Sequence, residues 1–277
     1  EGEDEPEPIF IGGAGRSGTT LFRAMMDAHP RISCGPEAKL VPVIMGLRQQ
    51  WLESMGSQLE SAGISEGDID KAVGAFVGSL FEGMAEKSPG MRIAEKTPHN
   101  LLYMKQLASI FPRARFIHIL RDGWGVASSL VRQGWMDAAT GQPLWYCQSV
   151  ENGARYWGSV VQQVHSQVKG LEDRFLEVRY EALVQDPQKE MARVMAFLGE
   201  AWSEQVLNHH TSDVALPSTE SSSEAVSEAI HTRAVEGWRS RLSPEELQAV
   251  EATAGPVLKE LGYMDDDSEP ELLAKAG

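Results

Sequence analysis

Cysteine, metal-binding patterns and glycosylation sites are almost absent from this sequence. The 277 residues include only two cysteines, Cys34 and Cys147, and no Asn-x-Ser/Thr sequon, C-x-x-C or H-E-x-x-H pattern. Two cysteines without such a pattern give neither a disulfide framework nor a metal-ligand set. We therefore predict two buried, reduced thiols and no bound metal, for which a cytosolic setting fits best.

Basic residues are also scarce. The chain has 25 lysines and arginines against 40 acidic residues, a formal net charge of -15. This balance disfavours nucleic acid and anionic membrane as partners, so any anionic ligand must be held by local charge. Acidic residues crowd both ends, from which we predict solvated tails over residues 1–8 and 264–277 around one domain of residues 9–263. A homodimer is compatible with this composition.

Long apolar runs are missing too. No stretch approaches the roughly 20 apolar residues of a membrane span, and the N-terminus lacks the basic-then-apolar layout of a signal peptide. The first residue is Glu1 rather than methionine, which leaves room for a leader, an anchor or a preceding domain. We expect no membrane partner for the chain as printed.

The periodicity that is present indicates an α/β fold. Short apolar runs alternate with helical patterns and predict a parallel sheet covered by helices on both faces. Ligands of such sheets bind at the carboxyl ends of the strands. A polar, serine-rich stretch at residues 203–231 is expected to be a loop or lid. The predicted strands are residues 9–11, 91–94, 116–120 and 176–180, and the predicted helices are residues 19–28, 41–85, 100–110, 126–132 and 187–198.

A glycine-rich turn follows the first predicted strand and opens the first helix. Such a turn presents backbone N–H groups and a helix N-terminus to an anion, and Arg16 adds a cation. The turn is not the ATP-type G-x-x-x-x-G-K-[ST] loop, because Thr19 follows Gly18 where a lysine would reach the γ-phosphate. The sequence thus predicts a phosphate-binding site formed by Gly15, Arg16, Ser17, Gly18, Thr19 and Thr20.

Several segments together resemble the tyrosylprotein sulfotransferases. The opening block is the most specific, whereas the middle blocks are shared by sulfotransferases generally. The resemblance spans roughly residues 9–263 and implies a P-loop-like sulfotransferase fold that uses 3′-phosphoadenylyl sulfate (PAPS) and releases the 3′,5′-bisphosphate PAP. The matching blocks are residues 10–13, 16–21, 23–30, 34–37, 95–98, 111–116, 120–123 and 179–183.

The resemblance also implies catalytic roles. Sulfuryl transfer is an in-line displacement like phosphoryl transfer, so positioning and electrostatics are expected to dominate. Arg16 matches the family's contact to the 5′-phosphosulfate, and Lys96 matches the lysine that stabilises the transferring group. Glu37 matches the base that takes the acceptor's proton. Ser222 matches a lid serine near the scissile bond.

A second group of residues matches the 3′-phosphate end of PAPS. Arg121 and Ser129 match the family's pair for this phosphate, which suits the planar fork of arginine. Tyr180 matches a position that contacts the cofactor. Gly237 stands where tyrosylprotein enzymes carry a lysine, so Arg233 or Arg239 is expected to replace it.

Three features depart from the family. Ala94 stands where a disulfide partner of Cys34 is expected, which favours a reducing compartment, bacterial cytoplasm rather than Golgi lumen. Pro36 and Lys39 replace an acidic residue and an arginine, so recognition of an acidic acceptor is expected to be weaker or different. Tryptophans and tyrosines cluster between residues 124 and 157, either as helix packing or, for Trp135 and Trp145, as a pocket for an aromatic acceptor.

We therefore predict a PAPS-dependent sulfotransferase whose first acceptor is a tyrosine or phenolic hydroxyl of a peptide or protein. The main alternative acceptor is a hydroxyl on a small molecule, a lipid or a carrier-tethered intermediate. Two other classes stay open from the residues alone. A nucleotide kinase or hydrolase would need a magnesium ligand, for which Asp122 is a poor candidate, and a silent PAP-binding module would not need Glu37 and Lys96.

Overall fold

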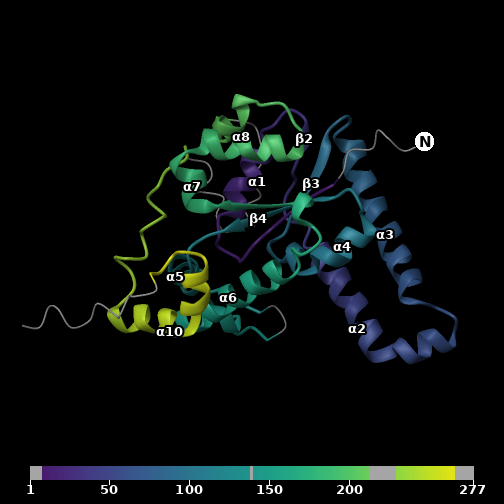
Figure 1. Cartoon of the computed structure of the whole chain (residues 1–277), viewed down its shortest axis with the longest axis horizontal. Helices are drawn as coiled ribbons and strands as arrows, with labels where there is room; N and C mark the ends of the chain where they lie inside the picture. The colour runs from purple at the N-terminus through teal and green to yellow at the C-terminus, as the bar shows by residue number, and fades with distance from the viewer. Residues whose placement is uncertain (1–7, 138–139, 212–228, 266–277) are drawn as a thin grey trace, which may run out of the picture.

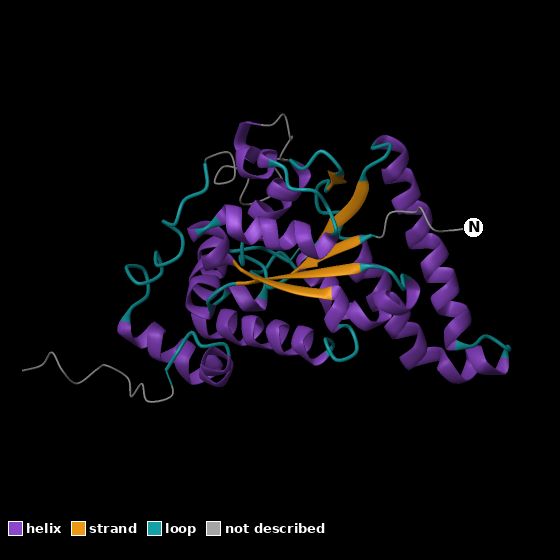
Figure 2. Ribbon diagram, turned by 45° about the horizontal axis from the view of Figure 1, so that its top comes forward, coloured by secondary structure: helices purple, strands orange, loops and turns teal. Residues whose placement is uncertain are grey.

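The computed structural model describes residues 8–137, 140–211 and 229–265. A five-stranded, fully parallel sheet with strand order β2-β3-β1-β4-β5 forms its centre, and helices cover both faces (Figures 1 and 2). The predicted α/β fold is confirmed. The strands are β1 Ile9–Gly12, β2 Ile32–Ser33, β3 Arg92–Lys96, β4 Arg115–Leu120 and β5 Phe175–Arg179.

Helices connect the strands as right-handed crossovers require in a parallel sheet. The α-helices are α1 Thr19–Asp27, α2 Leu40–Ser61, α3 Glu66–Lys87, α4 Met104–Ile110, α5 Gly123–Gln133, α6 Val150–Ser166, α7 Tyr180–Gln185, α8 Pro187–Leu198 and α10 Pro244–Glu260. Short 3-10 helices are η1 Pro98–Tyr103, η2 Trp145–Cys147, η3 Glu172–Arg174 and η4 Glu204–Thr211. The predicted tails fall almost wholly outside the described residues, so the domain limits stay a prediction.

The central strands are buried on both faces, which explains their nearly continuous apolar sequences. In β1, Phe10 packs into a cluster with the helices on one face, while Ile9 and Ile11 pack into a second cluster with α1 and α8 on the other. In β4, Phe116 lies stacked on Phe10 with ring centroids 5.8 Å apart. Alternation along these two strands therefore fixes which helices cover which face.

The sheet brings the ends of three strands together. β1 pairs with β3 on one side and β4 on the other, so the turn after β1 lies between Lys96 at the end of β3 and Arg121 just after β4. Strands β2 and β3 are added on one side of β1, and β4 and β5 are added on the other. Open α/β sheets usually bind ligands where the strand order switches sides in this way.

Some elements differ from the sequence prediction. Residues 41–85 form two helices rather than one stretch, because the chain turns at Gly63 with a φ of 75° before Ser65 caps α3. The α2–α3 hairpin projects from the body of the molecule (Figure 1). The two-residue strand β2 was too short to predict. The expected lid is helical at its start, since η4 packs against α1.

Membrane-spanning helices are not found among the residues that the structure describes, because none combines sufficient length with sufficient apolar character.

Candidate active site

A cavity of about 780 Å³ opens at the carboxyl ends of β1, β3 and β4. It gathers residues from the glycine-rich turn, the start of α2, α5, α6 and the segment before α10. The predicted residues in its wall are Gly15, Arg16, Gly18, Thr19, Thr20, Glu37, Arg121, Ser129 and Tyr180. Ser222 lies outside the described residues, but Ala229, Ile230 and His231 of the same segment line the cavity.

The turn after β1 has the backbone geometry of an anion cradle. Gly13 and Gly18 have positive φ values of 154° and 99°, and Arg16 also adopts a positive φ of 75°. A side chain on Gly13 would lie 2.4 Å from the carbonyl oxygen of Ile119. Gly18 is the N-cap of α1 and offers no side-chain acceptor, so the first N–H groups of the helix face the cavity without a competing cap.

Two contacts from distant elements hold this turn in place. The Gly13 N–H donates to the Pro98 carbonyl at 2.8 Å, and the Gly15 N–H donates to the Tyr156 hydroxyl at 3.0 Å. The Tyr156 hydroxyl also lies 2.8 Å from Nε2 of His99. Burial raises the pKa of Tyr156 and lowers that of His99, so both groups are neutral where they share this hydrogen bond. Sequence reasoning missed both residues, because nothing local links them to the turn.

Arginine side chains surround the turn at close quarters. Arg16 Nε donates to Ser129 Oγ at 3.0 Å. Arg121 donates to the carbonyls of Arg16 at 3.2 Å and Ala234 at 2.6 Å, and its guanidinium lies 4.8 Å from the ring centre of Tyr180. Burial, followed by repulsion from Arg121 and Arg132, lowers the pKa of Arg16. Buried cations that repel one another are stabilised by an anion, so this group fits a ligand with phosphate or sulfate groups.

Two further arginines, Arg132 and Arg241, line the cavity, although no motif in the sequence pointed to them. Arg241 Nε donates to Ser128 Oγ at 3.1 Å. Arg239 instead packs over the Trp238 ring with its guanidinium 4.5 Å from the ring centre, and its exposed side chain pairs with Glu236. Neither Arg233 nor Arg239 is among the described residues that line the cavity. Arg241, from the same segment, lines the cavity instead.

Glu37 and Lys96 form an ion pair at one end of the cavity. Lys96 Nζ donates to Glu37 Oε1 at 2.5 Å. The lysine side chain is fully buried, whereas 19% of the Glu37 side chain is exposed to the cavity. Lys39 adds a second, looser positive charge 4.0 Å from the other carboxylate oxygen. Within the part of the chain that the structure describes, the pair is therefore reached through the carboxylate.

The loop that carries Glu37 is anchored to the end of β3. The Lys39 N–H donates to Thr97 Oγ1 at 3.2 Å, and the Ala38 N–H donates to Glu95 Oε1 at 3.3 Å. Glu95 also accepts hydrogen bonds from Thr97 Oγ1 at 2.7 Å and from Asn100 Nδ2. Burial raises the pKa of Glu95 despite these hydrogen bonds. The predicted base is thus positioned by a buried carboxyl that sequence reasoning overlooked.

Aromatic rings form one wall of the cavity. Tyr146 and Tyr156 are stacked with ring centroids 4.4 Å apart, and Trp135 lies edge-on to Tyr146. Trp135 lines the cavity as one interpretation expected, while Trp145 is 48% exposed and is not among the lining residues. Trp157 is fully buried in the core, so helix packing explains that member of the aromatic cluster.

Asp122 serves the local structure at the start of α5. Its Oδ1 accepts the Gly125 N–H at 2.5 Å as the N-cap of α5. Its Oδ2 lies 3.7 Å from Arg121 Nε and makes no hydrogen bond among the described residues. The helix cap and the neighbouring arginine account for this carboxylate without a magnesium ion.

Solved structures with the same fold are sulfotransferases. The sulfotransferase domain of the Synechococcus PCC 7002 olefin synthase matches 92% of this chain and 97% of its own, with a TM-score of 0.62 and 23% identity. Mouse sulfotransferase SULT7A1 complexed with PAP matches 94% of this chain and 88% of its own, with a TM-score of 0.55 and 13% identity. The chain thus has the same fold as these sulfotransferases.

Sequence comparison assigns the family. The sulfotransferase family model matches residues 8–204. Protein-tyrosine sulfotransferase A of Caenorhabditis elegans is 32% identical over 96% of this chain and 71% of its own length, and human protein-tyrosine sulfotransferase 1 is 31% identical over 92% and 69%. The chain belongs to the sulfotransferase family, and the prediction of a PAPS-dependent sulfotransferase is confirmed. The kinase and silent-module alternatives are thereby set aside.

The prediction of a bacterial cytoplasmic enzyme is wrong. The curated relatives that match over most of the chain are animal protein-tyrosine sulfotransferases, including those of Caenorhabditis elegans, Danio rerio and Drosophila melanogaster. The prediction rested on Ala94 in the place of a disulfide cysteine. Cys34 and Ala94 are both fully buried in one apolar cluster. Apolar packing therefore holds these two segments together in place of the expected disulfide, and the absence of the disulfide does not indicate the cellular compartment.

Proposed function

We propose that this enzyme transfers the sulfuryl group to the phenolic hydroxyl of tyrosine in a polypeptide, with Glu37 as the base. The observation that carries the proposal is the partly exposed Glu37 carboxylate, paired with buried Lys96, in a cavity with an aromatic wall. The names of the relatives, protein-tyrosine sulfotransferases from several animals, support the same acceptor.

Two groups of residues would bind the two ends of the sulfuryl donor, PAPS. PAPS supplies an activated sulfuryl group and carries phosphate at both ends of its ribose. The N–H groups of the turn, with Arg16, Thr19 and Thr20, would hold the 5′ end. Arg121 and Ser129 would hold the 3′-phosphate, with Tyr180 beside them. Arg241 joins this group in place of the predicted Arg233 or Arg239.

Glu37 and Lys96 would act in sequence. The two opposite charges lie 2.5 Å apart and neutralise each other. A hydroxyl that approaches the exposed side of Glu37 can give its proton to this carboxylate, and Lys96 is then left to stabilise negative charge on the transferring group. Because Lys96 is fully buried, its charge is little screened by water and acts strongly at short range. We also propose that this chemistry uses no metal ion.

Local charge supports an acidic polypeptide despite the net charge of -15. Lys39, Arg132 and Arg241 all line the cavity, so its rim is basic while the surplus acid lies elsewhere. Charges beyond about 10 Å are largely screened at physiological ionic strength, so the nearby basic groups decide what the cavity attracts. The replacement of an arginine by Lys39 keeps the positive charge that such an acceptor needs.

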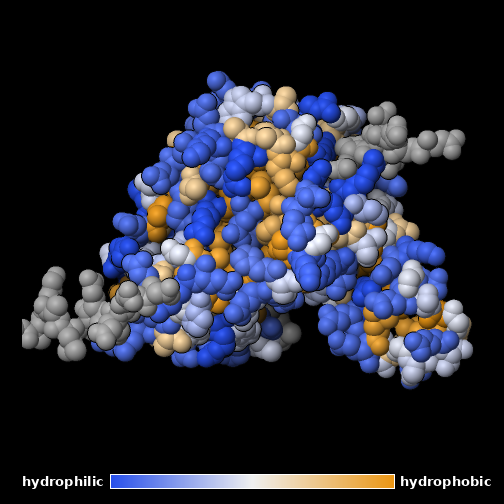
Figure 3. All heavy atoms as spheres, viewed as in Figure 1, coloured by the Kyte–Doolittle hydropathy of each residue, from blue (hydrophilic) through white to orange (hydrophobic). Residues whose placement is uncertain are grey.

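An apolar stripe along α2 supports an acceptor larger than a single ring. Val43, which lines the cavity, is followed at four-residue intervals by Leu47, Trp51 and Met55, all exposed. Residues four apart lie on one side of a helix, so the stripe leads away from the cavity mouth. Apolar surface gathers on the projecting hairpin (Figure 3). A polypeptide whose tyrosine enters the cavity would lay its neighbouring residues on this stripe.

A transfer assay with radiolabelled PAPS tests the proposal. The purified chain is offered a tyrosine-containing acidic peptide, the same peptide with phenylalanine in place of tyrosine, and a simple phenol. Transfer to the tyrosine peptide alone, or with much higher kcat/KM than to the phenol, supports the proposal. Transfer only to phenols, lipids or carrier-bound hydroxyls would establish the alternative acceptor. A homodimer stays a prediction, which sedimentation of the same sample tests.

A further inference from the structure

We propose that His118, His165 and Glu177 form a site for one divalent transition-metal ion, zinc by preference, outside the catalytic cavity. Among the residues that the structure describes, this is the one group of three or more potential ligands whose donor atoms all lie within 4.8 Å of one another. None of the three lines the cavity. The inference is independent of the acceptor proposed above.

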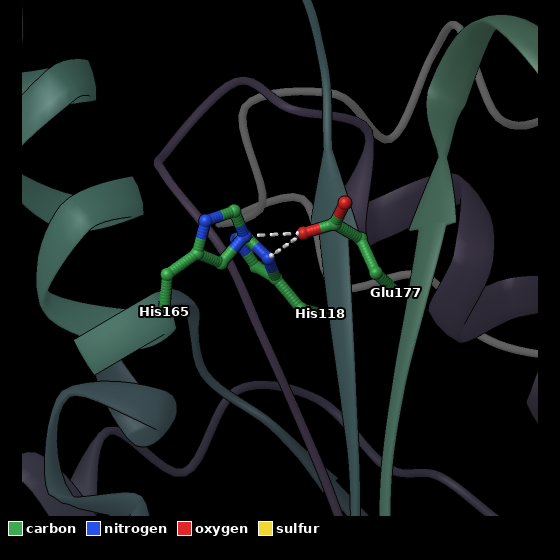
Figure 4. Close-up of side chains that lie close together, drawn as sticks. All are labelled: His118, His165 and Glu177. Carbon is green, nitrogen blue, oxygen red and sulfur yellow. Dashed lines mark hydrogen bonds and ion pairs between the residues drawn. The ribbon is translucent and has the colours of Figure 1, made fainter. Parts of the chain in front are cut away.

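Three packed elements supply the ligands. His118 in β4 and Glu177 in β5 are register partners in neighbouring parallel strands, so their side chains leave the same face of the sheet. His165 comes from the last turn of α6, which covers that face. Figure 4 shows both imidazoles turned toward one carboxylate oxygen of Glu177. Because each ligand belongs to a different element of the core, the site needs no loop to close around the ion.

The distances suit a small first-row ion after a slight adjustment. His118 Nδ1 lies 3.0 Å and His165 Nε2 lies 2.7 Å from Glu177 Oε2. A tetrahedral zinc ion with bonds of about 2.0–2.1 Å separates its ligands by about 3.3 Å. The two carboxylate–imidazole separations therefore need to grow by about 0.3 and 0.6 Å, which rotation of the partly exposed carboxylate allows. Two imidazoles and one carboxylate are a common ligand set for zinc.

The charge around the three residues also suits a cation. Although burial opposes it, hydrogen bonds from both histidines lower the pKa of Glu177 to about 2, so the carboxylate is ionised at neutral pH. Burial lowers the pKa of His118, which keeps it in the neutral form that binds metals. Glu260, at the end of α10, lies close enough to His165 to raise its pKa together with Glu177. Two carboxylates near one position attract a divalent cation by their negative charge.

Access and position indicate a bracing role. The side chains of His165 and Glu177 are 30% and 24% exposed, which leaves a path for the ion and a place for water as a fourth ligand. His118 Cδ2 lies 3.6 Å from where a Cβ on Gly13 would stand, so the ion would brace the floor of the phosphate loop. His118 Nε2 is buried without a hydrogen-bond partner. When Nδ1 of His118 binds the ion, the ring proton sits on Nε2, where no group among the described residues accepts a hydrogen bond from it. Because this cost weakens binding, we expect micromolar rather than tighter affinity for the ion.

Metal titration of the full chain tests the site. After treatment with a chelator, the protein is titrated with zinc against a chromophoric competitor, and separately with cobalt(II), whose visible absorption reports its ligand geometry. We expect one ion per chain, a higher unfolding temperature, and loss of at least tenfold in affinity in His165→Ala and in Glu177→Gln. His210→Ala, which removes a histidine outside the group, is the matched control and should bind normally.

Two results would overturn the inference. Zinc binding that is as strong in His165→Ala and Glu177→Gln as in the wild type would place the ion elsewhere. No binding at a zinc concentration 100-fold above the expected dissociation constant would identify the three residues as a hydrogen-bonded cluster only. Circular dichroism confirms that each variant is folded. PAP binding by the same samples separates this question from the proposed function, because a chain that binds PAP but no zinc rejects the metal site alone.

Discussion

Lys96 Nζ lies 2.5 Å from Glu37 Oε1, and the lysine is fully buried while the glutamate reaches the cavity. The two residues are 59 positions apart and meet because β3 ends beside the loop that precedes α2. The two opposite charges neutralise each other at the edge of the cavity. Under the proposed mechanism, removing the carboxylate would affect both proton removal and the position of Lys96.

Glu37→Gln tests the base directly. We expect turnover to fall by about 10²–10⁴-fold, the usual contribution of a general base, with PAP affinity unchanged within a few-fold. Steady-state kinetics and calorimetric titration with PAP measure the two effects. Glu53→Gln, an exposed glutamate on α2, is the control and should be fully active. Near wild-type turnover in Glu37→Gln would show that another group takes the proton.

Arg121→Ala tests how the 3′-phosphate is recognised. A charged hydrogen bond contributes about 1.5–3 kcal/mol, so PAP affinity should fall by about 10–100-fold. Binding of adenosine 5′-phosphosulfate, which lacks the 3′-phosphate, should fall much less. Arg239→Ala, an arginine paired with Glu236 outside the cavity, should leave both affinities intact. Equal losses for both ligands would mean that Arg121 only supports the loop.

Gly18→Ala tests the geometry of the phosphate loop. The backbone of Gly18 has a φ of 99°, and a Cβ there would lie 2.3 Å from the Tyr180 ring. We expect a loss of about 1–3 kcal/mol in the free energy of unfolding and at least tenfold weaker PAP binding. Gly56→Ala in α2 has open space and should be neutral or stabilising by up to about 1 kcal/mol. Unchanged stability and PAP affinity in Gly18→Ala would contradict the model of the loop.

If the apolar stripe on α2 binds the acceptor polypeptide, a substitution on it should change the KM for a polypeptide but not the KM for a small phenol. Trp51→Ser should raise KM for a tyrosine polypeptide by about tenfold, because a partly buried tryptophan contributes a kcal/mol or more. KM for a simple phenol should not change, since Trp51 lies outside the cavity wall. Leu80→Ser on α3, similarly exposed, is the control. A parallel rise for both acceptors would assign Trp51 to stability rather than to docking.

Asp122 predicts a pH effect on stability. Burial, opposed by Arg121, raises its pKa from 3.8 to about 6. Between about pH 4 and pH 6 this carboxyl is therefore mostly protonated in the folded protein and mostly ionised in the unfolded chain. This group therefore favours folding more as the pH falls from 7 to 5, by about 1 kcal/mol. Urea unfolding should show that the wild type gains this amount relative to Asp122→Asn. Asp186→Asn, the exposed N-cap of α8, should lack the effect.

Local patterns predicted the parts of the site that lie within one segment. The turn between β1 and α1 was predictable because glycines, a following helix and Arg16 stand next to one another. Arg121 was predictable because it directly follows a buried strand and matches the residue that resembling sulfotransferases use for the 3′-phosphate. The serine-rich segment after residue 203 was harder, since its first part forms η4 against α1, and composition alone does not reveal that packing.

Residue patterns alone were enough to predict the α/β fold, the phosphate loop and the resemblance to sulfotransferases, because each depends on short-range periodicity or on adjacent residues. Tertiary packing was needed to show that Tyr156, 141 positions after Gly15, anchors this loop, and that Arg241 rather than Arg239 faces the cavity. It also decided that His118, His165 and Glu177 meet. These contacts join distant positions whose spacing carries no periodic signal, so they exist only once the helices have packed onto the sheet.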